Sequence, residues 1–600
     1  MRGSPVALAI AIALILAVSL ILFIPYAPVT SDISEYESSS YYPLIESIED
    51  YRLELRQPKT KNNFETLEAI IISLLRSNIQ YDGDMAPESG DSYVEFTDNQ
   101  VSGIIEQDLV KMSDKYIFRL NARNFLMVYS IDKENSEMVA SFKIDHLTSS
   151  HEWYLVGMYL SEDCNTVTVI RQFNNSQCRD LGIVSIDVSD INNIHVKNTA
   201  IVSGKINTTR MINGKLLIVT NSNHRTSDVD YNVPESFVPY IDTGDGPAPM
   251  EIDDIIIPDK VNNMSYGVVS MFDEDTLELI DAKALLNFTN TVYVAKDNLY
   301  ITNDYTVREI NGKITHHTDM SDIAVLGYSD EGFEEKAVFT VLGQMKDQYS
   351  FDEKDGYLRA VASTSERDTT EKLYYTSTKT LSENVSLYVF DIEGGSLAYK
   401  VEDFAINGEE ATAVRFEGDK LYVCTAQVFD FTDPVFFFDL SDYENITYTD
   451  TGIIDGFSSS LINYGDGLAL GIGQQNWEEG KVEMYAERDG AVVSIAEFRF
   501  LGTYSANYKS YLIDRENRLF GFTVDHYEYV DEQTGERKYH RDPVFLLLQF
   551  DGEEFKVLEL LYPMFSDGNE HIRLDIVRAV CIDGYLYITQ DHLFRVEQIG

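Results

Sequence analysis

The chain has little proline, tryptophan, cysteine and positive charge. Only 14 prolines and 2 tryptophans occur among 600 residues, against 38 tyrosines and 31 phenylalanines, and this balance favours β-strands. There are 47 basic against 99 acidic residues, a net charge of −52. Binding of nucleic acid needs a basic patch, and no cluster of Lys and Arg occurs, so it is not expected. The acidic excess fits the solvated surface of an exported protein, or attraction of divalent cations and basic partners.

Motifs of common catalytic sites are missing from the sequence. There is no G-x-x-x-x-G-K-[ST] phosphate loop and no H-E-x-x-H metalloprotease motif. The segment 456–460 lacks the final glycine of a serine-hydrolase elbow. His316 and His317 are adjacent, would point to opposite faces of a strand, and are interpreted as surface residues. No catalytic residue is therefore predicted.

A long apolar run occurs near the start of the chain, at Val6–Ile24. As a helix it would be roughly 28 Å long, about the thickness of a bilayer core. Arg2 precedes it and Asp32 follows it, so the positive-inside rule places the residues after 30 outside the cytoplasm. An uncleaved anchor over residues 1–30 is predicted. Cleavage after Ala27, which would give a secreted protein, is the alternative.

Residues 31–92 are predicted to form a tether with short amphipathic helices. Pro43–Arg56 is compatible with a short helix, and apolar residues recur at helical spacing over Phe64–Leu75. An amphipathic stripe of this kind usually packs on a folded core. The second helix is therefore expected to contact the domain that follows.

Hairpin cassettes recur from about residue 93 onward. Each has Gly, Asn or Asp at a two-residue turn followed by apolar residues, as at 213–218, 297–301, 355–358, 418–423, 465–468, 516–520 and 583–587. A second marker is a carboxylate after the third strand of a block, at Asp132, Asp187, Asp273, Asp391, Asp439 and Asp551. These carboxylates are interpreted as turn caps rather than catalytic groups.

Regular repetition of four-strand blocks predicts an all-β fold, a β-propeller over residues 93–600. Eight blades are favoured and seven to nine are allowed. The final partial block, from Ile572, is expected to close the ring with strands near residues 93–106. A long insertion at Asn223–Asn263 interrupts the third block, and loops of this length are either functional or disordered.

Two further sets of residues are candidate sites. Oxygen-bearing side chains that could bind calcium lie in the insertion, at Asp228, Asp230, Asn232, Asp242 and Asp245, although the glycine and distal glutamate of an EF-hand are missing. Cys164 and Cys178 flank a predicted strand and could form a disulfide after export. Calcium is therefore the one cofactor considered, and the alternative is none.

Three motifs carry a resemblance to a known family. The segment 98–111 (DNQVSGIIEQDLVK) is followed by Tyr116-Ile117-Phe118, the second motif runs over 414–423 (VRFEGDKLYV), and the third joins Asp352-Glu353 to 356–360. Together they resemble a family of exported bacterial and archaeal β-propeller proteins distantly related to WD repeats. The resemblance implies an exported propeller and transfers no catalytic residue. Ile105 departs from the family, which usually has an acidic residue there.

Two functional hypotheses follow. The favoured one is a membrane-tethered, extracytoplasmic binding or scaffolding module for an unidentified protein, peptide or glycan, because propellers present loops around one face. The alternative is a cell-envelope hydrolase or lyase whose site is built from loops of several blades and is calcium-dependent in one version. Clustered carboxylates with one pKa raised by burial would favour the alternative.

Overall fold

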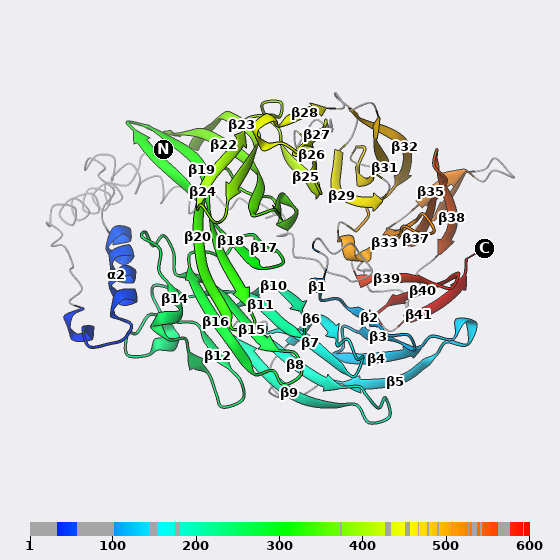
Figure 1. The fold of residues 1–600 in the computed structure, drawn as a ribbon, viewed down its shortest axis with the longest axis horizontal. Coiled ribbons are helices and arrows are strands. Elements are labelled where there is room, and N and C mark those ends of the chain that lie inside the picture. Colours follow the sequence, from blue (N-terminus) through cyan, green and yellow to red (C-terminus); the bar gives the residue numbers. More distant parts are fainter. Residues whose placement is uncertain are drawn as a thin grey trace, which may run out of the picture.

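The fold is a ring of antiparallel sheets, each standing beside the next around a common centre (Figure 1). The computed structural model describes residues 33–56, 101, 103–144, 153–173, 180–372, 375–426, 434–450, 457–465, 467–476, 479–488, 491–505, 507–525, 527–530, 537–540, 543–561, 576–591 and 593–599. Within these residues the chain builds consecutive units of four strands and ends in a unit of three. The predicted all-β architecture is confirmed.

The first five units follow one another along the chain. The first unit comprises β2 Val110–Met112, β3 Tyr116–Leu120, β4 Phe125–Ser130 and β5 Met138–Lys143. The second unit comprises β6 Trp153–Leu160, β7 Thr166–Phe173, β8 Leu181–Asp187 and β9 His195–Val202. The third is β10 Lys205–Ile212, β11 Lys215–Asn223, β15 Ser265–Asp273, β16 Leu279–Leu286. The fourth unit comprises β17 Val292–Val294, β18 Asn298–Asn311, β19 Ile314–Ser329 and β20 Gly332–Leu342. The fifth unit comprises β21 Phe351–Lys354, β22 Tyr357–Lys372, β23 Tyr375–Asp391 and β24 Ser396–Val401.

Four more units complete the described ring. The sixth unit comprises β25 Glu410–Glu417, β26 Lys420–Ala426, β27 Val435–Asp439 and β28 Thr447–Asp450. The seventh unit comprises β29 Phe457–Gly465, β30 Leu468–Gln474, β31 Glu479–Arg488 and β32 Ala491–Leu501. The eighth is β33 Leu512–Asp514, β34 Leu519–Val524, β37 Val544–Phe550, β38 Phe555–Leu561, with a side hairpin of β35 Tyr527–Val530 and β36 Arg537–His540. The last is β39 Arg578–Ile582, β40 Tyr585–Gln590, β41 Leu593–Gln598.

The predicted hairpin turns form as their chemistry requires. Asn213 and Gly214 have φ of 49° and 74°, and Asp583 and Gly584 have φ of 50° and 76°. Two consecutive residues with positive φ match the right-handed twist of the flanking strands, which is why Asn-Gly and Asp-Gly occupy these positions. At these two turns the local sequence therefore sets the strand register, whereas the predicted turn at Asp297 and Asn298 forms without positive φ.

The hydrophobic core is divided among the interfaces between neighbouring units. Central strands are buried on both faces, so β7 has buried side chains along its whole length, whereas all four residues of the outer strand β28 are exposed. One apolar cluster joins the first unit to the second, and further clusters join each consecutive pair around the ring. A final cluster places Ile117 and Tyr129 of the first unit against Tyr585 and Tyr587 of the last unit. The ring therefore closes through side chains between sheets.

The predicted ring closure through residues 93–106 is tested only at the end of that segment. The strand nearest the predicted closing segment, β1 Ile105–Glu106, pairs with Arg210 and Met211 of β10 in the third unit and not with the last unit. Residues 93–100 lie outside the described residues. The three-stranded last unit packs face to face on the first unit, with Tyr585 and Tyr587 in the shared apolar cluster.

The insertion at Asn223–Asn263 is an ordered clamp between the second and third units. It contains η3 Pro234–Ser236, η4 Ile252–Asp254, and the strands β12 Tyr240–Asp242, β13 Ala248–Pro249 and β14 Ile255–Ile256. β12 extends the second sheet beyond β9, and β14 pairs in parallel with β16 of the third sheet. The insertion thereby covers two sheet edges whose backbone groups would otherwise be exposed.

A helix from the predicted tether packs on this clamp. After η1 Ser34–Tyr36, α2 Tyr42–Arg56 lies outside the ring beside β14 (Figure 1). Leu44, Ile45 and Ile48 are fully buried in the core cluster of the second and third units. The predicted short helix is confirmed, and this part of the tether is docked.

Two membrane-related predictions remain open. In the part of the chain that the structure describes, no helix is long and apolar enough to cross a bilayer. The predicted anchor at Val6–Ile24 and the predicted helix at Phe64–Leu75 lie outside the described residues.

Candidate binding site

The segment that carries the first family motif forms a buried charged cluster, here called the Glu106 hub. Glu106 forms an ion pair with Arg210 of β10, with 3.0 Å between Oε1 and Nη2, and accepts a hydrogen bond of 2.9 Å from the Tyr508 hydroxyl. Tyr508 belongs to η7 Tyr508–Ser510, and its side chain lies 402 residues further along the chain. Both charged side chains of the ion pair are 4% exposed. The hub therefore joins the first motif to distant parts of the ring.

Asp108 provides the second half of the Glu106 hub. Its carboxylate accepts bonds of 2.9 and 3.0 Å from Nε of Arg578, at the start of β39 and 470 residues away in sequence. The Lys509 ammonium donates to the backbone carbonyl of Gln107 at 3.0 Å. Burial lowers the pKa of Lys509 well below its usual range, and the charges of Glu106 and Asp108 oppose this shift. The hub binds the N-terminal segment to the C-terminal unit, so its role is structural.

The third family motif also joins units. Asp352 accepts from Nε of Arg359 at 3.0 Å, and Nη1 of Arg359 donates to the carbonyl of Gly418 in the sixth unit at 2.9 Å. Glu353 accepts from the hydroxyl of Tyr300 in the fourth unit at 2.6 Å. The sequence made these motif residues recognisable but did not explain their role. The structure shows that they link neighbouring sheets.

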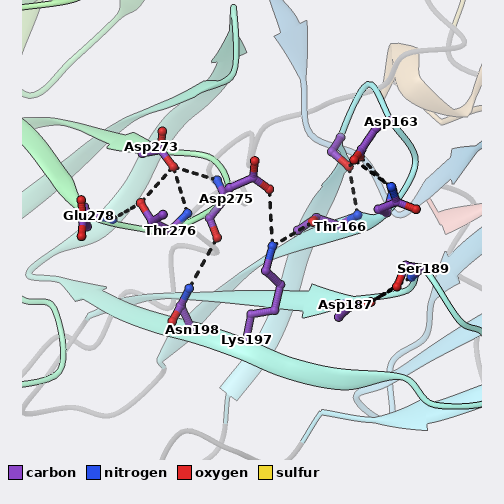
Figure 2. A network of polar contacts seen from close by, with 12 residues as sticks. Asp163, Thr166, Asp187, Ser189, Lys197, Asn198, Asp273, Asp275, Thr276 and Glu278 are labelled. Carbon is purple, nitrogen blue, oxygen red and sulfur yellow. Dashed lines mark hydrogen bonds and ion pairs between the residues drawn. The ribbon is translucent and has the colours of Figure 1, made fainter.

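Five of the six predicted carboxylates cap turns, but Asp132 makes no side-chain cap bond and only its backbone N–H donates, to Ser136. Figure 2 shows Asp187 accepting from Ser189, and Asp273 accepting from Thr276, at turns of the second and third units. Asp439 and Asp551 make the same kind of bond to backbone N–H groups two residues ahead. The capping interpretation is confirmed at these positions, where the oxygens are used to hold the turn.

The turns in Figure 2 are linked across two units by one lysine. Lys197 of β9 reaches Oδ1 of Asp275 at 3.4 Å and Oγ1 of Thr166 at 3.2 Å, and Asn198 donates to the Asp275 carbonyl. Asp275 is 72% exposed, so this ion pair contributes little free energy. The network is a surface link between units.

A buried carboxyl group beside this network makes stability depend on pH. Burial, followed by the charge of Asp275, raises the pKa of Glu274 to about 7. A raised pKa in the folded state means that stability is fully present below the unfolded value near 4.5 and is lost as pH rises through about 7. Glu274→Gln is therefore expected to stabilise the protein by about 1–2 kcal/mol near pH 8, and by almost nothing near pH 4.5. Urea denaturation at the two pH values measures the difference.

Glu278→Gln is the matched control for this prediction, because Glu278 is exposed on the same turn. It should give the same unfolding midpoint as the wild type at both pH values. A pH-independent gain in the Glu274→Gln variant would contradict the assignment.

The predicted calcium ligands are used as turn acceptors in the insertion. Asp230 accepts from the backbone N–H and the amide of Asn232, and Asp228 accepts from Ser227. Asp242 accepts from the N–H groups of Gly244 and Gly246, and Asp245 is exposed. Across the described ranges, no three His, Cys, Asp or Glu side chains are grouped so that they could hold a metal ion. Calcium binding stays a prediction.

The predicted disulfide also stays a prediction. Cys164 lies in the turn between β6 and β7 with φ of 58°, but Cys178 lies outside the described residues.

His316 and His317 are half-buried rather than exposed. His316 Nδ1 lies 3.0 Å from Asp368 of β22, and His317 Nε2 lies 2.7 Å from the hydroxyl of Thr369. The histidines thus sit where β19 pairs with β22 and joins the fourth and fifth units into one sheet.

A surface cavity of about 610 Å³ gathers polar side chains from several units. It is here called the Glu383 cavity, and its lining includes Asp319 of β19, Lys346 after β20, Thr364 of β22, Glu383 of β23, Glu410 of β25 and Ser459 of β29. Four units contribute to it. Another cavity, of about 420 Å³, lies between the third and fourth units and is spanned by an ion pair of Lys215 with Asp330.

Two β-bulges shape the wall of the Glu383 cavity. Thr412 is the extra residue between Ala411 and Ala413 in the pairing of β25 with β26, and Ser459 is the extra residue between Ser458 and Ser460 in β29. Both extra residues line the cavity. Bulges redirect side chains and are common next to binding sites. No feature of the sequence marks these two positions, so sequence reasoning missed them.

The electrostatics of the cavity are set by two carboxyl groups. Burial, followed by the charge of Glu383, raises the pKa of Glu410, while Lys346 acts in the opposite direction. Asp319, by contrast, forms an ion pair with Arg367, with 2.6 Å between Oδ2 and Nη1. Among the described carboxylates of the lining, Glu383 and Glu410 therefore differ from Asp319 in forming no ion pair.

A closed ring of four-stranded antiparallel sheets defines the protein as a β-propeller. The chain belongs to the beta propeller domain family, whose model matches residues 95–600. An uncharacterized protein of Archaeoglobus fulgidus is 25% identical over 339 residues, which cover 56% of this chain and 46% of that protein. An uncharacterized protein of Methanocaldococcus jannaschii is 24% identical over 251 residues, 41% of this chain and 34% of that protein. The chain thus spans less than half the length of these curated relatives.

The solved structures that the chain matches have low sequence identity and low TM-scores. The acylaminoacyl peptidase of Pyrococcus horikoshii is 10% identical, with 70% of this chain and 57% of that chain covered and a TM-score of 0.28. The C-terminal WD40 domain of Sif2 is 9% identical, with 64% and 97% covered and a TM-score of 0.23.

Proposed function

We propose that this protein is a membrane-tethered, extracytoplasmic binding or scaffolding module that binds a protein, peptide or glycan in the Glu383 cavity. The observation that carries the proposal is the cavity itself. Its volume of about 610 Å³ lies within the range of ligand sites, and it is open to solvent on a ring surface. Hydroxyl, amide and carboxylate groups converge on it from several units, as in sites assembled from propeller loops.

The rigid ring supports this proposal. The Glu106 hub joins units far apart in sequence, and Arg359 joins the fifth unit to the sixth through the Gly418 carbonyl, so the cavity walls are positioned before a ligand arrives. A site that is pre-organised in this way loses little conformational entropy on binding. We further propose that the ring has eight four-stranded blades, with β39–β41 as an additional shorter one, within the predicted range of seven to nine.

The tether is the less direct part of the proposal. The apolar run Val6–Ile24 predicts a membrane anchor, and the docked helix α2 would fix the ring close to it. Location outside the cytoplasm follows from the charge bias around that run. Protease protection in intact cells, with a tag after Gly600, tests the orientation.

The binding proposal is tested by filling the cavity. The full chain in detergent is screened on peptide and glycan arrays alongside Thr412→Trp, whose indole would occupy the cavity, and Thr447→Trp, at an exposed position of β28. We expect a ligand that binds the wild type and Thr447→Trp equally, and Thr412→Trp at least about tenfold more weakly. Lack of any ligand, or a ligand indifferent to Thr412→Trp, would refute the cavity as the binding site.

One observation favours a second function, a hydrolase or lyase. Glu383 and Glu410 line the same cavity, and burial together with the charge of Glu383 raises the pKa of Glu410. A carboxyl group with a raised pKa beside a second carboxylate can act as a general acid. Turnover of an array ligand that disappears in Glu410→Gln, while binding persists, would establish this function in place of simple binding.

A further inference from the structure

The Glu383 cavity has an excess of negative charge that its own residues do not neutralise. Its lining holds the carboxylates of Asp319, Glu383 and Glu410 and the ammonium of Lys346. Asp319 is paired with Arg367. Among the described residues, the carboxylates of Glu383 and Glu410 accept no hydrogen bond and form no ion pair, so two negative charges face one positive charge.

The position of Lys346 leaves these two carboxylates available. Its ammonium lies 3.4 Å from the carbonyl of Ser459 on the seventh unit. The carboxyl group of Glu410 responds more strongly to burial and to Glu383 than to Lys346, and its pKa is raised as a result. A cation bound between the two glutamates would reverse that shift.

Three hydroxyl-bearing residues, Ser363, Thr412 and Ser459, line the same cavity, two of them at the bulge positions. The Ser363 hydroxyl already accepts from the N–H of Ala411, and the Ser459 hydroxyl bonds the Ile472 carbonyl and the Tyr504 hydroxyl. The Thr412 hydroxyl donates to the Cys424 carbonyl, so its oxygen lone pairs can still accept. An ammonium group has three N–H donors and no acceptor, so it needs several oxygens around one point. The described carboxylates do not form a group that could hold a metal ion, which favours an organic cation.

We propose that the Glu383 cavity binds a primary ammonium group, with Glu383 and Glu410 as its counter-ions and Thr412 as a neutral acceptor. This inference rests on the proposed function, because it names the ligand class of the same cavity. The ammonium group can be a lysine side chain, the amino terminus of a peptide, or one end of a free diamine. These sources share the chemistry that the site recognises, and the experiment separates them.

The test is calorimetric titration of the full chain with defined probes. They are Nα-acetyl-lysine amide, its Nε-acetylated counterpart, glycylglycine amide, cadaverine and calcium chloride. We expect at least one amine to bind, and Nε-acetylation to weaken the lysine probe at least about tenfold, because it removes the charge. The ranking of lysine amide, glycylglycine amide and cadaverine identifies the source.

Charge-matched variants test the assigned residues. Glu383→Gln and Glu410→Gln are each expected to weaken amine binding about tenfold or more, since each loses a charged hydrogen-bond acceptor. Asp275→Asn removes the same charge from an exposed position in the Figure 2 network and is expected to change binding less than about twofold.

The outcomes separate this inference from the proposed function. If no amine binds, if the acetylated probe binds equally well, or if calcium binds in place of the amines, the ammonium assignment is overturned. If an array ligand is lost in Thr412→Trp but kept in both glutamine variants, the binding function stands and the ammonium assignment falls. If the array ligand also binds Thr412→Trp as tightly as the wild type, both the binding function of the cavity and the ammonium assignment are overturned.

Discussion

Replacing Asp108 with alanine is expected to lower the free energy of unfolding by about 3–5 kcal/mol. The Asp108 carboxylate is 1% exposed and the Arg578 side chain is 5% exposed, so the substitution would leave a buried guanidinium without its counter-ion. Because the pair joins β39 to the segment before β2, the loss should open the ring between its first and last units. Urea denaturation followed by circular dichroism gives the change in stability.

An exposed ion pair provides the control for this prediction. Lys400 and Glu402 are 2.6 Å apart, but their side chains are 45% and 52% exposed, so Lys400→Met should cost less than about 0.5 kcal/mol. The double variant Asp108→Leu with Arg578→Leu should be less destabilised than the sum of its single variants, because both buried charges are removed together. Equal effects of Asp108→Ala and Lys400→Met would show that the hub is not a structural tie.

The hub shows which part of the fold could be predicted from sequence. Its first half lies in the recognised motif around residues 98–111, but Arg210, Tyr508 and Arg578 lie in strands and turns with ordinary local sequences. The hydrogen bond from Tyr508 to Glu106 crosses 402 residues. Contacts over such distances depend on how the ring closes, and no local pattern encodes them.

The turn conformations and turn caps could be predicted because they involve residues close together in sequence. Positive φ at Asn213 and Gly214, and the bond from Ser441 to Asp439, involve residues next to each other in sequence. Turn residues of these types adopt these conformations in many contexts. The repeated hairpins and turn caps, and from them the propeller, were therefore accessible before the structure.

The Glu383 cavity could be predicted less well than the local turns, because its residues form a cavity only through the folded arrangement of several strands. Its residues are serines, threonines and glutamates on strands, which are common on exposed sheet surfaces and form no motif. What makes them a site is the bulge at Thr412 and at Ser459, together with the approach of β23 to β25. The calcium candidates in the insertion had a clearer sequence pattern, yet the structure uses those oxygens within their own turns.

The docking of α2 determines how the predicted anchor is connected to the ring. Ile48 is fully buried, so Ile48→Asp would place a carboxylate in an apolar interface and is expected to destabilise docking by at least about 3 kcal/mol. The undocked helix would then be exposed far more often, and its cleavage by trypsin at Arg52 and Arg56 should accelerate about 100-fold. Cleavage is followed by mass spectrometry, and the unfolding midpoint of the ring is measured in parallel.

The matched control lies on the same helix. Leu55 is 60% exposed, so Leu55→Asp adds the same charge without entering the interface and should leave the cleavage rate within about twofold of the wild type. If Ile48→Asp is cleaved no faster than Leu55→Asp, α2 does not hold the ring to its tether through this interface. If it is cleaved faster while the unfolding midpoint of the ring is unchanged, α2 is a docking element that unfolds separately from the ring.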